Sequence, residues 1–203
     1  MLKDNLLLDS ARPISEAPNM DKGCPELSSE GVPLSWYALR VSYSRELKIQ
    51  DALNAQGIRT FVPMMWRKSG TAQERKLVPA VGNLCFAFST KNRLEDFIRG
   101  YGENSPVHLY WDRTAGRPLT VPDKAMNDFI SVASTLDENL IYITEITSKL
   151  REGHSVKVKD GPFKGIEGKV IRIRKSRRIL VELPGMLAVA TTYITPDFIE
   201  IIA

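Results

Sequence analysis

The fold of the C-terminal part of the chain is decided by the stretch Val156-Lys157-Val158-Lys159-Asp160-Gly161-Pro162-Phe163-Lys164-Gly165-Ile166-Glu167-Gly168-Lys169-Val170. Val156 and Val158 alternate with lysines, which is typical of a strand with one buried face. The Asp-Gly-Pro that follows favours a tight turn. Gly165 and Gly168 allow positive φ or a close approach to another strand, and Phe163 can anchor the loop to a core. We therefore expect two strands joined by a compact loop.

This stretch resembles the KOW motif, in which a strand, a loop of the form Gly-Pro-Phe-x-Gly-x-x-Gly and a second strand belong to a small SH3-like barrel. The residues that carry the resemblance are Asp160, Gly161, Pro162, Phe163, Gly165 and Gly168. The motif occurs in ribosomal proteins and in transcription elongation factors of the NusG type. Each of these residues also has a purely structural interpretation, in which it builds the barrel and contacts no partner.

Five short β runs are expected in this part of the chain. They lie at residues 155–158, 169–173, 179–183, 187–191 and 198–201. Their number suits a small barrel, so we assign residues 151–203 to a KOW domain. Its expected core residues are Val156, Val158, Phe163, Val170, Ile173, Val181 and Ile199.

The N-terminal part instead alternates strands with helices. The expected strands lie at residues 36–41, 58–65, 83–88 and 107–110, and residues 67–76 are expected to form a polar loop. Apolar residues at helical spacing predict one helix that is capped within residues 42–44 and ends before Gly57, a second at 93–99 capped by Asn92, and a third after residue 122. The order β-α-β-β-α-β with a closing helix predicts a ferredoxin-like α+β fold with an antiparallel sheet.

The same part is similar to the NGN domain of NusG proteins. The similarity lies in Trp-Tyr-Ala-Leu-Arg-Val at residues 36–41, in Ser44-Arg45-Glu46 and in Phe61-Val62-Pro63. An NGN domain followed by a KOW domain is the NusG architecture, and the resemblance covers residues 35–203. The chain departs from it at Ala80-Val81-Gly82-Asn83, where NusG proteins commonly carry Phe-Pro-Gly-Tyr.

Four segments are expected along the chain. Residues 1–34 form a flexible, acidic extension, 35–133 the NGN-like domain, 134–150 a linker with a short strand at 140–143, and 151–203 the KOW domain. Residues 117–124 and 191–194 are most similar to specialised NusG paralogs of the UpxY type. Those paralogs are antitermination factors encoded at the head of capsular polysaccharide operons in Bacteroides-like bacteria.

Composition argues against several classes of protein. A chain of 203 residues that is 43% hydrophobic fits a soluble globular protein, and no apolar run approaches the ~20 residues that cross a bilayer, so we expect a cytoplasmic location. Cys24 and Cys85 are far apart, and only His108 and His154 could join them, so neither a disulfide framework nor a zinc site is expected. Because no catalytic motif is present, we expect neither an enzyme nor a bound cofactor.

Positive charge is concentrated outside the N-terminal extension. The net charge is −3 over residues 1–34, +3 over 35–150 and +4 over 151–203. Five cations fall on one expected hairpin, namely Arg172, Arg174, Lys175, Arg177 and Arg178. They could meet phosphate or an acidic protein, or simply face solvent.

The resemblance implies a surface for RNA polymerase, because NGN domains of this family bind the clamp helices of its largest subunit. The matching positions are Phe61, Pro63, Met64, Met65, Trp66 and Phe86. Clustered Met and Trp side chains suit a partner surface, although the same residues could be ordinary core. A second set is expected to contact phosphates of the non-template DNA strand, namely Arg40, Arg45, Arg67 and Lys68.

Three functions are open at this point. The first is an antitermination factor that binds RNA polymerase and suppresses pausing and termination in polysaccharide operons. The second is a general NusG-type elongation factor whose KOW domain couples to Rho or to the ribosome. The third is a KOW-containing RNA-binding or ribosome-associated protein whose N-terminal domain merely resembles NGN.

Overall fold

The computed structural model describes residues 26–28, 31–68, 74–145, 153–173 and 175–202, so the predictions for residues 1–25 and for Cys24 lie outside it. Its first sheet has the antiparallel order β2-β5-β1-β6, with a short fifth strand beside β1. The strands are β1 (Ser35–Val41), β2 (Arg59–Phe61), β5 (Leu84–Ser89), β6 (Val107–Leu109) and β9 (Thr120–Val121). The strand expected at residues 83–88 is present as β5, and every residue of β5 is buried, as is typical of a nearly all-apolar strand in the interior of a sheet.

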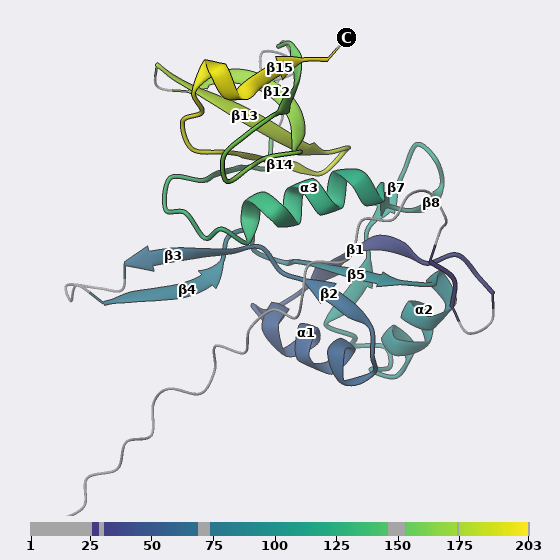
Figure 1. The fold of residues 1–203 in the computed structure, drawn as a ribbon. Coiled ribbons are helices and arrows are strands. Elements are labelled where there is room, and N and C mark those ends of the chain that lie inside the picture. Colours follow the sequence, from purple (N-terminus) through teal and green to yellow (C-terminus); the bar gives the residue numbers. More distant parts are fainter. Residues whose placement is uncertain (1–25, 29–30, 69–73, 146–152, 174, 203) are drawn as a thin grey trace, which may run out of the picture.

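Alternating side chains divide this sheet into two faces, each covered by helices (Figure 1). Leu39 of β1 and Cys85 of β5 pack with helices α1 (Glu46–Ala55) and α2 (Lys91–Arg99). Trp36 and Phe86, one residue out of phase, point to the opposite face and pack with helix α3 (Asp123–Ala133). The result is a mixed α/β arrangement of three helices about one sheet.

The helix ends differ in detail from the sequence prediction. The N-cap of α1 is Arg45, after positive φ at Ser44, and its side chain makes no capping bond, so the expected cap within residues 42–44 was wrong. The prediction of Asn92 as the cap of α2 was also wrong, because the hydroxyl of Thr90 accepts the bond from the backbone N–H of Arg93 (3.3 Å). Gly57, with φ +70°, ends α1 as predicted.

The C-terminal part forms a second, six-stranded antiparallel sheet with the order β10-β14-β13-β12-β11-β15. Its strands are β10 (Ile141–Ile143), β11 (Ser155–Val158), β12 (Glu167–Ile173), β13 (Ser176–Leu183), β14 (Leu187–Ala190) and β15 (Ile199–Ile201), with a 3₁₀ turn, η1 (Pro196–Phe198), before the last. All five predicted runs are present, and the sixth strand, β10, confirms the short strand expected within the linker. Four of the expected core residues are buried, and the others are partly buried, namely Val170, Ile173 and Ile199.

Two small hairpins stand apart from these sheets. One pairs β3 (Met64–Lys68) with β4 (Arg75–Pro79), and the other pairs β7 (Trp111–Asp112) with β8 (Arg117–Pro118). The polar loop predicted at residues 67–76 is therefore wrong at both ends, because the strands continue into it. Within the described ranges, no helix has the length and apolar character needed to span a membrane.

Helix α3 lies between the two sheets (Figure 1). One apolar cluster contains Phe86 of the first sheet, Phe129 of α3 and Val181 of the second sheet. The second sheet therefore covers the outer face of α3, and the two parts of the chain share a core.

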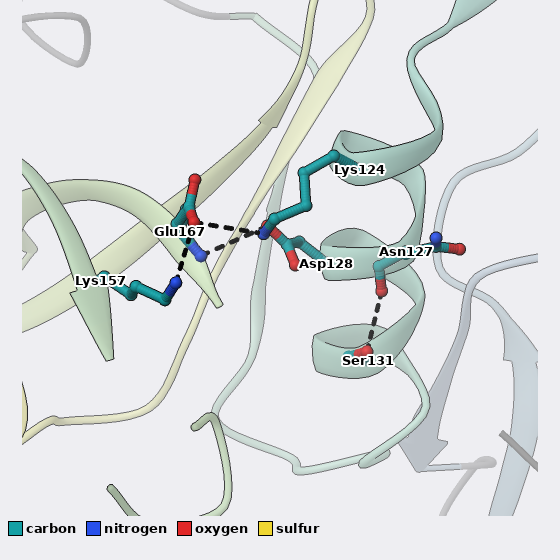
Figure 2. A network of polar contacts seen from close by, with 6 residues as sticks. All are labelled: Lys124, Asn127, Asp128, Ser131, Lys157 and Glu167. Atoms are coloured by element: carbon teal, nitrogen blue, oxygen red, sulfur yellow. Dashed lines mark hydrogen bonds and ion pairs between the residues drawn. The ribbon is translucent and has the colours of Figure 1, made fainter. Parts of the chain in front are cut away.

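Polar contacts beside this core join α3 to the second sheet (Figure 2). The carboxylate of Asp128, itself almost fully buried, accepts from Lys124 Nζ (2.5 Å) and from the backbone N–H of Glu167 (3.3 Å). The Glu167 carboxylate lies 3.5 Å from Lys157 Nζ and 3.8 Å from Lys124 Nζ. These bonds satisfy the charges where α3 meets β11 and β12.

Candidate functional site

The β3–β4 hairpin projects from the body of the protein (Figure 1). In its register Met65 faces Val78, and Trp66 faces Leu77. Met64 and Met65 are half-buried at the base, whereas the Trp66 and Leu77 side chains are 41% and 38% exposed. Three of the residues predicted to contact polymerase are therefore at least partly accessible.

Four cations extend this hairpin beyond Trp66. Arg67 faces Lys76 and Lys68 faces Arg75, and all four are exposed. Like charges directly opposite each other in a β-ladder are destabilising, so stability of the hairpin does not explain this pattern. Of these four cations, only Arg75 has an acidic partner among the residues that the structure describes, namely Glu138.

Sequence reasoning missed Arg75 and Lys76 because it placed them in a loop. A signal was available, since Met-Met-Trp before the loop is mirrored by Leu-Val-Pro after it, at residues 64–66 and 77–79. Two short apolar runs at equal distance from a polar centre are typical of a hairpin.

The rest of the predicted polymerase patch lies inside the protein. Phe86 is fully buried, and Phe61 is partly buried at the edge of the same sheet. Their rings make edge contacts with Phe129 of α3, at centroid distances of 6.1 Å for Phe86 and 6.2 Å for Phe61. Pro63 is also buried. Phe86 and Pro63 therefore do not face solvent, and the Pro63 carbonyl accepts a bond from the backbone N–H of Ala80, just after β4 (2.8 Å).

The remaining predicted phosphate contacts lie away from the hairpin in sequence. Arg40 is exposed on β1, and Arg45 places its guanidinium 5.5 Å from the ring centre of the exposed Tyr43. No hydrogen bond or ion pair joins Arg40 or Arg45 to the hairpin in the described part of the chain. Neither of them belongs to the β3–β4 hairpin.

The residues that resemble a KOW motif build the loop between β11 and β12 and the start of β12. Asp160 accepts a bond from the backbone N–H of Gly161 (2.8 Å), and Gly161 and Gly165 have φ of +85° and +88°. Phe163 is buried in the shared core. A Cβ on Gly168 would lie 2.5 Å from the carbonyl oxygen of Leu180. Pro162 lies between these glycines in the turn. Most of the motif therefore has a direct structural role.

Nothing in the described residues forms a metal-binding group of three or more His, Cys, Asp or Glu side chains. Cys85 is buried in the centre of the first sheet, and burial, followed by the charge of Glu46, raises the pKa of its thiol to about 12. A thiol with that pKa is a poor nucleophile and a poor metal ligand near neutral pH.

Comparison with known proteins finds one similar solved structure and one family model that matches part of the chain. No curated protein matches the chain. A solved structure described as "Domain interaction in Thermotoga maritima NusG" is similar to it, with 20% sequence identity, a TM-score of 0.42, and coverage of 84% of this chain and 98% of that chain. Residues 34–130 match the family described as "NusG: Transcription termination factor nusG". These residues include the first sheet, the β3–β4 hairpin and most of α3, so this part of the chain is similar to the NusG family of transcription factors.

Proposed function

We propose that this protein is a transcription elongation and antitermination factor that binds RNA polymerase and suppresses pausing and termination. The observation that carries the proposal is the NusG-family domain at residues 34–130. The exposed hairpin supports it, because Met and Trp side chains beside cations suit a contact with both protein and nucleic acid.

The mechanism is a shift between polymerase conformations, with no covalent chemistry. A factor that binds the closed, elongating clamp more tightly than the open, paused clamp changes their populations only by its differential affinity. A preference of about 1.4 kcal/mol changes the ratio of paused to elongating complexes about tenfold.

The polymerase contact uses Met64 and Met65, two of the accessible residues of the predicted patch. Both side chains are half-buried where the hairpin leaves the body. Phe61 and Phe86 pack on Phe129, and Pro63 bonds to Ala80 at the end of the hairpin, so we assign these three residues a structural part and no direct contact.

Cations on the hairpin and outside it contact the non-template DNA strand. Arg67 and Lys68 are exposed on the hairpin, and Arg40 and Arg45 are exposed outside it. Exchange of both Arg67 and Lys68 for Ala should lengthen pauses relative to the wild-type factor on a purified template. Unchanged pausing would argue against this contact.

The domain organisation follows the family. We assign residues 35–133 to a ferredoxin-like NGN domain and residues 151–203 to an SH3-like KOW barrel. The strand order β2-β5-β1-β6 supports the first assignment, and the pairing of the last strand, β15, with β11 supports the second. Operation in polysaccharide operons rests on the similarity to UpxY-type paralogs.

A second candidate is a general NusG factor whose KOW domain couples to Rho or to the ribosome. The description of the matched family as a termination factor favours it. It predicts polymerase occupancy across the genome, whereas an operon-specific factor predicts local occupancy.

An affinity purification scored for polymerase, ribosome and Rho tests these alternatives. We expect the full chain to retain bacterial RNA polymerase, and Met64→Ala with Met65→Ala to retain less of it. Arg113→Ala, a change on the other hairpin, is the control. Retention of ribosomes without polymerase would overturn the proposal.

A further inference from the structure

We infer that one face of the β3–β4 hairpin is a stacking platform for an unpaired polynucleotide strand, on which Trp66 stacks against a base while Lys68 and Arg75 hold phosphates. This inference deepens the proposed function, because it names the chemistry that the hairpin recognises. It also assigns Trp66 to nucleic acid, whereas the sequence prediction placed it against polymerase.

The register brings these residues to one face. Side chains two apart in a strand share a face, and so do residues directly opposite each other in a ladder. Trp66 and Lys68 are two apart in β3, and they face Leu77 and Arg75, respectively. An indole ring, an apolar side chain and two cations therefore occupy one side of the ribbon.

The other face adds charge without an aromatic ring. Arg67 and Lys76 are opposite each other, one residue out of phase with Trp66. Glu74 directly precedes β4, and no ion pair joins it to the four cations in the described part of the hairpin. Within the described part of the chain, Glu138 at Arg75 is the acidic side chain that offsets repulsion among the four cations. A bound polyanion would therefore reduce this repulsion on both faces.

The aromatic ring favours an unpaired strand over a duplex. Proteins that bind single strands without sequence preference combine a positive surface with aromatic side chains on which bases stack. A base inside a duplex is already stacked on both sides and offers no free face. Trp66 is 41% exposed and has no ring contact with another described aromatic residue, so its surface is available.

The ion pair of Arg75 gives the site a further, testable property. Arg75 and Glu138 are both about half-exposed, so the pair is screened and weak. A phosphate competes with Glu138 for the guanidinium. Glu138→Gln should therefore increase affinity for a single strand by about two- to threefold, whereas a purely structural role of Arg75 predicts no increase.

The first experiment measures binding of a fluorescent single strand of about 12 nucleotides to the full chain without polymerase. Trp66→Ala and Trp66→Leu should weaken binding by about 5- to 100-fold, as expected for the loss of one stacked base, while Trp66→Phe should retain most of it. Trp111→Ala removes the other exposed tryptophan (54% exposed) and should leave the affinity unchanged. Thermal unfolding of each variant verifies that it folds.

The second experiment measures how affinity depends on salt. Lys68→Ala and Arg75→Ala should each reduce the slope of log affinity against log salt by about 0.7, the value for one phosphate contact to a single strand. Arg113→Ala, a cation on the other hairpin, should not change the slope. Parallel arms with DNA and RNA of the same sequence identify which strand is preferred.

The third experiment observes stacking directly. In a Trp111→Phe variant, Trp66 is the exposed tryptophan and Trp36 is buried, so a single strand should quench the exposed fluorescence. The inference is overturned if Trp66→Ala binds as tightly as wild type, if duplex DNA competes as well as a single strand, or if no quenching occurs on binding. Because no polymerase is present, these outcomes are independent of polymerase retention, which tests the proposed function.

Discussion

The backbone N–H of Glu167, at the start of β12, donates a hydrogen bond to the carboxylate of Asp128 in α3, with 3.3 Å between nitrogen and oxygen. Asp128 is only 7% exposed, and Lys124 supplies the opposite charge on the same helix. Buried carboxylates are stable only when they are paired and hydrogen-bonded. This contact therefore fixes the second sheet against helix α3.

Removing that carboxylate should destabilise the protein. Asp128→Ala removes the nearer of the two carboxylates around Lys124 and the acceptor of the Glu167 N–H, so we expect the free energy of unfolding to fall by about 1–3 kcal/mol. Urea unfolding of the full chain measures this change. Ser131→Ala is the matched control on the same helix, because it removes an exposed bond to the carbonyl of Asn127 and should change stability by less than about 0.5 kcal/mol. Equal effects of the two substitutions would show that the Asp128 contact is not stabilising.

Gly165 and Gly168, in the loop and strand that follow β11, should respond differently to alanine. Gly168→Ala places a Cβ against the carbonyl of Leu180, and backbone cannot easily move, so we expect a loss above about 3 kcal/mol. In Gly165→Ala the new Cβ has no neighbouring atom within contact distance. The positive φ at this position should still lower the free energy of unfolding by about 1–2 kcal/mol. Chemical denaturation of both variants tests the order. A milder effect at Gly168 than at Gly165 would contradict the close approach of β12 and β13.

The thiol of Cys85 should be unreactive in the folded protein. In a Cys24→Ser variant, alkylation at about pH 8 requires unfolding, because burial, followed by the charge of Glu46, raises the Cys85 pKa to about 12. The folded state also holds this proton more tightly than the unfolded chain, for which the pKa is 9.0. The stability that protonated Cys85 contributes to the folded state is therefore fully present below pH 9. The free energy of unfolding falls as the pH rises from 9 toward 12. Rapid labelling without denaturant would contradict the burial of β5.

The sequence predicted the central elements well because their patterns are set by burial. The apolar run of β5 and the spacing of Met126, Phe129 and Ile130 in α3 both follow from apolar faces that must be covered. The β3–β4 hairpin was missed because its outer half is exposed on both faces. The sequence around Arg67 and Lys76 therefore lacks the alternation of apolar and polar residues that predicts a strand. Burial of Phe86 by α3, and of α3 by the second sheet, is a tertiary relationship that one strand's pattern cannot reveal.

Transcription by purified bacterial RNA polymerase on a template with defined pauses and a terminator tests the central claim most directly. Addition of the full chain should shorten the pauses and increase the fraction of transcripts that extend past the terminator. If the protein neither associates with the polymerase nor changes transcript length, the proposed function is wrong.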